Sequence, residues 1–175
     1  MIVNLIGAPG AGKSTTRADT FRILKQNGVK CEECTEYAKD LVWEERALTL
    51  SSQPYIFSKQ LRNMERVIGK VDVLITDSPL ILNRYYTEKY RAGVYPDSFL
   101  NFVSDQFIRM GGITYLIERV HAYETIGRSQ SQEQSDEVGL ELVEMLDRFG
   151  ITYKRLLGNN EAGPLIAADI MAHLG

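Results

Sequence analysis

An eight-residue segment near the amino end constrains this chain more than any other feature. Residues 7–14 read Gly-Ala-Pro-Gly-Ala-Gly-Lys-Ser, fit the pattern G-x-x-x-x-G-K-[ST], and directly follow the apolar run at residues 1–6. A strand that enters a glycine-rich turn and leaves it as a helix turns backbone N–H groups inward around an anion. The sequence therefore predicts a phosphate-binding loop.

The positions of this loop have separate expected tasks. Lys13 is expected to reach the β- and γ-phosphates of ATP, and the Ser14 hydroxyl to hold Mg²⁺. The start of the following helix adds partial positive charge. The residues expected to contact the nucleotide are Gly7, Ala8, Pro9, Gly10, Ala11, Gly12, Lys13, Ser14 and Thr15.

Length and composition favour one domain over residues 1–175. The chain is 44% hydrophobic and 25% charged, which is enough apolar content to bury a core of that size. It shows neither an apolar run of membrane-spanning length nor a basic secretory leader, so we expect a cytoplasmic protein (host cytoplasm if viral) without a membrane partner. The net charge of −3 argues against a generic nucleic-acid coat, although a local basic groove stays open.

The two cysteines, Cys31 and Cys34, form a C-x-x-C pair. No second pair and no nearby histidine completes a four-ligand zinc set. An expected strand at residues 29–34 would point them to opposite faces of a sheet. We therefore expect two ordinary thiols.

Short apolar segments alternate with helical patterns along the whole chain. This alternation predicts an α/β protein with the P-loop NTPase fold: a parallel sheet of about five strands, with helices on both faces. Strands are expected at residues 1–6, 29–34, 71–76, 113–117 and 151–157. Helices are expected near residues 13–27, 36–49, 53–69, 79–91, 96–110 and 161–173. A further helix is expected to follow the polar stretch near 118–135 and to end at Gly150.

Two carboxylates follow expected strands and should meet the loop at one edge of the sheet. Asp77 ends the third strand and could hold Mg²⁺ through water or accept a proton; alternatively it caps the next helix. Glu36 follows the second strand and could orient or deprotonate a hydroxyl acceptor. Its alternative is a first-turn acid in a helix capped by Thr35.

The polar stretch at about residues 118–135 lies between a strand and a helix and is expected to form a lid. Arg128, beside Gly127, is the first candidate to neutralise the transferring phosphoryl group, and Arg119 is the second. The alternative for each is a solvated surface arginine. His121 is expected to be a surface residue rather than a metal ligand.

Two aromatic segments allow a binding or a structural interpretation. The helix at residues 53–63 contains Phe57, Gln60 and Arg62, which could contact a nucleobase or belong to the core. The basic and tyrosine-rich stretch at residues 84–91 could bind a single nucleic-acid strand or form a solvated helix end.

Together these segments resemble P-loop nucleoside and nucleotide kinases, most closely the compact thymidylate-kinase-like proteins of bacteriophages. The resemblance covers most of the chain: the loop at 7–14, Thr35 to Lys39, the Phe57–Gln60–Arg62 helix, Thr76 to Pro79, and Gly127 to Gln130. Some of those proteins phosphorylate 5-hydroxymethyluracil in DNA during thymidine hypermodification. Such kinases usually carry arginine after the strand-three acid, where Ser78 stands here.

The resemblance implies an enzyme, a P-loop kinase that moves the γ-phosphoryl of ATP, with Mg²⁺, to a hydroxyl of a pyrimidine nucleotide near Glu36 and Asp77. The acceptor could be 5-hydroxymethyluracil in modified DNA, or a free deoxynucleoside or its monophosphate. A non-catalytic ATP-binding regulatory module is the alternative from another class, while the N-K-x-D motif of a GTPase is absent. The oligomeric state stays open, a dimer included.

Overall fold

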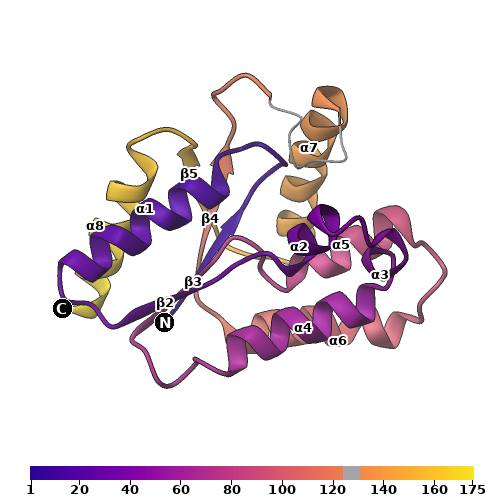
Figure 1. The fold of residues 1–175 in the computed structure, drawn as a ribbon, viewed down its shortest axis with the longest axis horizontal. Helices are drawn as coiled ribbons and strands as arrows, with labels where there is room; N and C mark the ends of the chain where they lie inside the picture. Colours follow the sequence, from indigo (N-terminus) through magenta and orange to yellow (C-terminus); the bar gives the residue numbers. More distant parts are fainter. Residues whose placement is uncertain (124–130) are drawn as a thin grey trace.

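The computed structural model describes residues 1–123 and 131–175, which are arranged around a central sheet (Figure 1). All strand pairs in this five-stranded sheet are parallel, and the strand order is β2-β3-β1-β4-β5. The strands are β1 (Ile2–Ile6), β2 (Cys31–Cys34), β3 (Val73–Thr76), β4 (Ile113–Glu118) and β5 (Lys154–Leu157). The predicted α/β class and parallel five-stranded sheet are confirmed.

Helices cover both faces of the sheet, as predicted. Buried residues of α1 and α8 pack on one face, and buried residues of α4, α5, α6 and α7 pack on the other. The helices are α1 (Lys13–Gln26), α2 (Tyr37–Trp43), α3 (Ala47–Leu50), α4 (Gln53–Glu65), α5 (Ile81–Tyr90), α6 (Asp97–Met110), α7 (Gln132–Arg148) and α8 (Ala162–Leu174). None of these described helices has the length and apolar character needed to cross a membrane.

The three central strands β3, β1 and β4 are buried on both sides because each side meets a layer of helices. In β3, Val73 and Ile75 enter the core beneath α1 and α8, while Leu74 enters the core beneath α4–α7. The two cysteines follow the same alternation: Cys31 belongs to the first core and Cys34 to the second. Both thiols are free, and they lie on opposite faces of the sheet as predicted.

The helix expected over residues 36–49 is wrong, because two short helices, α2 and α3, occupy this range. Glu45 lies between them with φ of 55°, a left-handed conformation that cannot continue a right-handed helix. The Arg46 N–H closes the end of α2 by donating to the Leu41 carbonyl at 2.9 Å. Neither glycine nor proline marks this break in the sequence.

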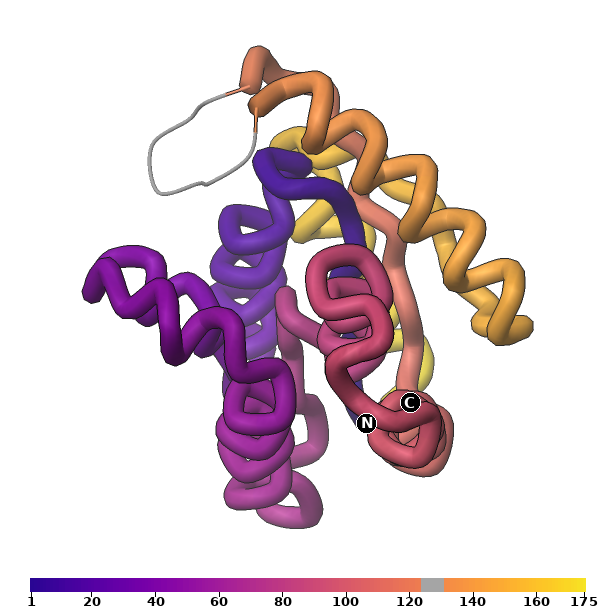
Figure 2. The backbone as a smooth tube through the Cα atoms, turned by 90° about the vertical axis from the view of Figure 1, so that its right-hand side faces the viewer, coloured from indigo at the N-terminus to yellow at the C-terminus, as the bar shows by residue number. Residues whose placement is uncertain are grey.

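The carboxyl ends of β1, β2, β3 and β4 lie along one edge of the sheet, since all pairs are parallel. The segments after these strands, which carry residues 7–12, Glu36, Asp77 and Arg119, therefore share that edge. Figure 2 shows the amino-terminal part of α7 passing close to the loop that follows β1. The topology thus gathers the predicted site residues that the structure describes.

We predict that Leu74→Ala lowers the free energy of unfolding by about 3 kcal/mol, because it leaves a cavity beside β1 in a core position that is 1% exposed. Leu48→Ala is the matched control, since Leu48 is 90% exposed and should change that free energy by less than about 0.5 kcal/mol. Urea unfolding followed by circular dichroism measures both. Equal losses in the two variants would contradict the assigned core.

Candidate functional site

The loop after β1 has the backbone that an anion cradle requires. Gly10 and Gly12 adopt positive φ values of 79° and 92°, which residues with a side chain rarely adopt. The Ala11 N–H donates to the Ala8 carbonyl at 3.1 Å and closes a tight turn. Helix α1 begins directly afterwards at Lys13, so its N–H groups open toward the loop.

Three neighbouring segments hold this loop in place. A Cβ atom on Gly7 would overlap the Ile117 carbonyl of β4, and one on Gly158, after β5, would overlap the Ala11 carbonyl. From α7, the Ser135 hydroxyl donates to the Pro9 carbonyl at 2.6 Å. These contacts fix the conformation of the loop backbone.

The Lys13 ammonium group lies inside the loop. Its Nζ donates to the carbonyl oxygens of Gly7 and Ala8 at 2.7 and 3.0 Å. Both acceptors belong to the first turn of the loop, on the side from which β1 enters. The structure therefore places the ammonium group within the loop, and its contact with phosphates stays a prediction.

Asp77 meets the loop helix across the sheet edge. Its Oδ2 accepts a hydrogen bond from Ser14 Oγ at 2.8 Å, and its Oδ1 lies 3.4 Å from Arg17 Nη1. The alternative role of Asp77 as a helix cap is wrong, because α5 begins at Ile81 with Leu80 in the cap position. The carboxylate and the Ser14 hydroxyl predicted to hold Mg²⁺ are thus in direct contact.

Glu36 occupies the position before the first residue of α2, without capping the helix through its side chain. Burial raises the pKa of the Glu36 carboxyl, nearby Lys13 lowers it, and nearby Asp77 raises it again. Tyr86 of α5 lies close as well: burial, then the Glu36 charge, raises the pKa of its hydroxyl. The alternative of a first-turn acid capped by Thr35 is therefore wrong, and Glu36 belongs to the same site as Lys13 and Asp77.

Arg17 is a member of this site that the motifs did not indicate. Its guanidinium lies between Asp77 and Glu33, with Nε 3.4 Å from Glu33 Oε2, and its side chain is only 12% exposed. Positions three and four residues apart share one face of a helix, so Arg17 faces the same way as Ser14 and Lys13 on α1. The spacing of Arg17 from Lys13 and Ser14 was the signal in the sequence that could have indicated its place in the site.

Of the two predicted lid arginines, the structure describes Arg119 alone; Arg128 lies outside the described residues. Arg119 is not a solvated surface arginine, because its side chain is 13% exposed and pairs with Asp136 of α7. Its guanidinium also lies 5.2 Å from the Tyr123 ring centre. These contacts tie the segment after β4 to the start of α7.

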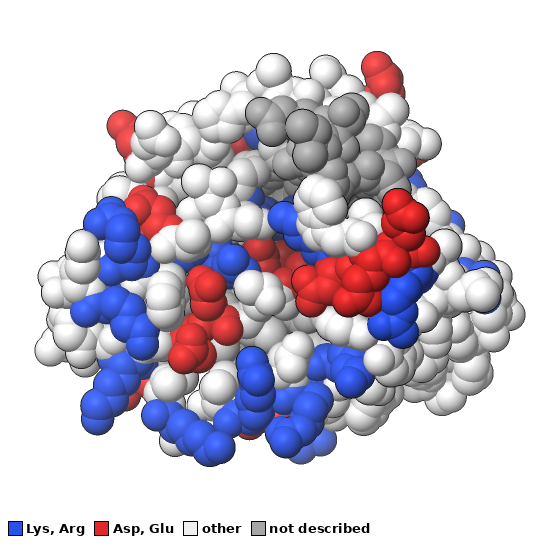
Figure 3. Space-filling view, viewed as in Figure 1, with Lys and Arg blue, Asp and Glu red and all other residues white. Residues whose placement is uncertain are grey.

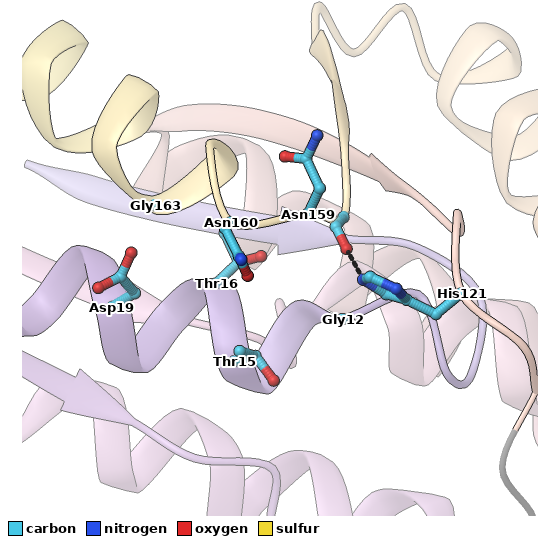
Figure 4. Close-up of a pocket in the computed structure, with 9 residues that line it drawn as sticks. Gly12, Thr15, Thr16, Asp19, His121, Asn159, Asn160 and Gly163 are labelled. Atoms are coloured by element: carbon cyan, nitrogen blue, oxygen red, sulfur yellow. Dashed lines mark hydrogen bonds between the residues drawn. The ribbon is translucent and has the colours of Figure 1, made fainter.

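A pocket of about 400 Å³ adjoins the loop on the α8 side (Figure 4). Its lining residues are Gly12, Thr15, Thr16, Asp19, His121, Gly158, Asn159, Asn160 and Gly163. His121 Nε2 lies 2.7 Å from the Gly158 carbonyl oxygen, so the ring contacts the segment that backs the loop. Asn159 and Asn160 bring side-chain amides to the same pocket.

The two aromatic segments are largely structural. Phe57 and Gln60 are buried, and Gln60 accepts from the Tyr37 N–H while its amide approaches Cys34 and Thr76. In the other segment, Tyr85 donates to Glu141, a residue to which Lys89 also donates at 2.7 Å. These contacts give Gln60 and Tyr85 a packing role, whereas Tyr55, Lys59 and Arg62 of the first segment are exposed.

The donors in the site suit a magnesium ion. Ser14 Oγ and the Asp77 carboxylate are hard oxygen ligands, and Mg²⁺ commonly takes one or two protein oxygens together with phosphate and water. No group of three or more histidine, cysteine, aspartate or glutamate side chains that could hold a metal exists among the described residues. The pair at Ser14 therefore fits a metal that arrives with its phosphates.

Comparison with known protein families and with curated proteins found no match for this chain. The interpretation of the site therefore depends on its own geometry.

We predict that Gly158→Ala disrupts the loop, because the added Cβ would overlap the Ala11 carbonyl. It should lower the melting temperature and weaken ATP binding about tenfold or more, since a shift of the cradle loses at least one of its charge-assisted contacts. Gly139→Ala is the control: its Cβ would meet only the Ala8 Cβ at 3.6 Å, an ordinary contact. Calorimetric titration with ATP measures both, and unchanged affinity in Gly158→Ala would contradict the backing role.

Proposed function

We propose that this chain is an ATP-dependent phosphotransferase that moves the γ-phosphoryl group to a hydroxyl of a pyrimidine nucleotide. The observation that carries the proposal is the Ser14–Asp77 hydrogen bond of 2.8 Å at the mouth of the loop that holds Lys13. A P-loop nucleotide site needs a cation, a hydroxyl and a carboxylate around one set of phosphates. The P-loop NTPase fold is part of this proposal.

The position of the neighbouring pocket supports ATP as the donor. Phosphates in the loop would place the rest of the nucleotide beside Gly12 and Thr15, which line the pocket of about 400 Å³. That volume lies within the range of small-molecule sites. The Asn160 amide offers a donor and an acceptor to a base there, and the Asn159 amide offers a donor, since its oxygen accepts from the Glu161 N–H at 2.9 Å.

The Glu36 carboxylate is suited to receive the acceptor's proton. A raised pKa makes a carboxylate a stronger base, and Glu36 lies near Lys13 on the side away from the nucleotide pocket. In the step, the acceptor O–H gives its proton to Glu36 while its oxygen bonds to the γ-phosphorus. The bond from that phosphorus to the β–γ bridging oxygen breaks, and ADP leaves with the electron pair.

The remaining charged groups have supporting tasks. Ser14 and Asp77 would hold Mg²⁺, which supplies charge neutralisation on the β- and γ-phosphates when bound. Lys13 stabilises the same charge from within the loop. Arg17 holds Asp77 in place, and Arg119 and Arg128 are the lid arginines we assign to the transferring group.

For the acceptor we propose 5-hydroxymethyluracil within DNA, as in thymidine hypermodification. The resemblance to bacteriophage thymidylate-kinase-like proteins supports this choice, and Ser78 in place of the usual arginine favours an unusual acceptor. A flipped or single-stranded base would reach the cleft. A kinase of free deoxynucleosides or their monophosphates is the related alternative.

A regulatory ATP-binding module is the second candidate class. It needs the loop and the pocket but no base for an acceptor. The loss of hydration that raises the pKa of the Glu36 carboxyl costs stability without serving ATP binding, and this favours an enzyme.

We predict that the purified protein with ATP and Mg²⁺ phosphorylates 5-hydroxymethyluracil-containing DNA and that Lys13→Ala lowers the rate at least about 100-fold, because the γ-phosphate loses its cation. Lys25→Ala, which removes an exposed lysine from the other end of α1, should leave the rate unchanged. Mass spectrometry of digested nucleosides gives the readout. Transfer only to free nucleosides would favour the related alternative, and ATP that gives no thermal protection would exclude an enzyme or a module at this loop.

We predict that Glu36→Gln abolishes transfer while retaining ATP binding, and that it raises the melting temperature at neutral pH. The folded-state pKa of Glu36 lies above its ordinary value of 4.5, so the folded chain loses stability as the pH rises from 4.5 to the folded-state pKa, because the unfolded chain ionises first. The stability advantage of the glutamine variant should therefore vanish below the ordinary pKa. In the wild type the rate should fall on the acidic side as Glu36 becomes protonated.

Glu65→Gln is the control for this pair of measurements, because Glu65 is exposed on α4. It should alter neither the rate nor the pH dependence of melting. A glutamine variant at position 36 that still transfers phosphate would remove Glu36 from the role of base.

A further inference from the structure

The outer face of α4 carries basic side chains in a row. Lys59, Arg62 and Arg66 follow one another at spacings of three and four residues, which places them on one face of the helix and its last turn. All three are exposed, as is Lys70 in the turn that follows. Figure 3 shows Lys and Arg surface gathered along the lower edge of the molecule, over α4 and this turn.

The charge of this row contrasts with the rest of the chain. Residues 53–70 contain four basic residues and a single acidic one, a local charge of +3 in a chain with a net charge of −3. Within residues 1–123 and 131–175, Arg62, Arg66 and Lys70 form no ion pair, whereas Arg84, Arg148 and other basic residues do. Unneutralised like charges in one row repel one another, and a polyanion would relieve that repulsion.

Tyrosines join the row to the candidate site. The Tyr55 ring lies at the amino end of the row, with Lys59 Nζ 5.5 Å from its centre. The Tyr55 hydroxyl lies 3.1 Å from that of Tyr37, and the two rings meet edge to face at 5.9 Å. Tyr37 directly follows Glu36, so the row begins beside the carboxylate assigned to the acceptor.

We propose that the α4 basic row, comprising Lys59, Arg62, Arg66 and Lys70, binds the phosphates of a single-stranded nucleic acid whose neighbouring bases stack on Tyr37 and Tyr55. The proposal deepens the function proposed above, on which its link to catalysis rests, because it makes the acceptor part of a polymer. Basic side chains combined with exposed aromatic rings are the usual means of binding single strands.

The dimensions of the row agree with this partner. Lys59 to Arg66 spans about 10 Å along a helix with a rise of about 1.5 Å per residue. Three cations over that length can each face a different phosphate of one strand, because the axial spacing of phosphates is about 3.4 Å when the bases are stacked as in a duplex. Asp40, Glu44 and Glu45, in and after the neighbouring α2, would repel a strand there and so confine it to α4.

A nucleic acid fits this surface better than an anionic lipid surface does. A helix that lies in a membrane interface inserts a broad apolar face beside its basic residues. In α4 the apolar side chains Ile56, Phe57 and Met64 are buried in the protein core. Contact with a lipid surface would therefore depend on charge alone.

The test is binding of a fluorescein-labelled single-stranded oligonucleotide of about 16 nucleotides to the full chain, followed by anisotropy at about 50 and 200 mM salt. The variant Lys59→Gln/Arg62→Gln/Arg66→Gln should bind about tenfold or more weakly. Its log–log salt slope should shrink by about 2, since three phosphate contacts are lost. The control Arg22→Gln/Lys25→Gln/Lys30→Gln, with the same change of charge on and after α1, should stay within about twofold of the wild type.

Several results would overturn the assignment: no binding by the wild type, an α4 variant that binds as well as the wild type, or equal losses in both triple variants. Loss of binding to phosphatidylserine vesicles with unchanged oligonucleotide binding would assign the row to lipid instead. Thermal protection by ATP and Mg²⁺ is measured in parallel. Oligonucleotide binding without thermal protection by ATP would support the α4 basic row and contradict the proposed function. Thermal protection by ATP without oligonucleotide binding would support the nucleotide site and contradict the role of the α4 basic row.

Discussion

The hydrogen bond between Ser14 and Asp77 is the contact on which the candidate site depends. It joins the first turn of α1 to the end of β3 across 63 positions of sequence. The Asp77 side chain is only 4% exposed, and a buried carboxylate needs close partners to offset its lost hydration. Ser14 and Arg17, one helical turn apart, supply them. The same contacts that stabilise the charge therefore align the loop helix with the sheet.

The two carboxylates of the site have different surroundings. Asp77 has a hydroxyl donor and a guanidinium within 3.4 Å, whereas loss of hydration raises the pKa of the half-buried Glu36 more than nearby Lys13 lowers it. Different surroundings give two neighbouring acids different roles. The surroundings of Asp77 suit a ligand of a metal ion, and those of Glu36 suit a group that accepts a proton. The choice between Asp77 and Glu36 as base, open from sequence, is resolved in our proposal in favour of Glu36.

The sequence alone predicted the parts of the molecule that depend on local pattern. Short strand-like segments that alternate with helical patterns indicated all five strands, and the glycine spacing indicated the loop before Lys13. Residues whose importance comes from distant contacts were missed. Arg17 pairs with Asp77 after β3, Ser135 donates to the Pro9 carbonyl of the loop, and Gly158 packs against Ala11. No local motif encodes these contacts or the strand order β2-β3-β1-β4-β5. In the sequence, Asp77-Ser78-Pro79 resembled the start of a helix. The hydrogen bond from Ser14 to Asp77 could not be predicted there, because it joins residues 63 positions apart.

The close contact between Gly158 and Ala11 has a consequence for folding during synthesis. The loop follows β1, yet the backbone that supports it follows β5, the last strand of the described sheet. During synthesis the loop gains this support only after Gly158 has left the ribosome. The ability to hold a nucleotide therefore reports that folding has reached Gly158.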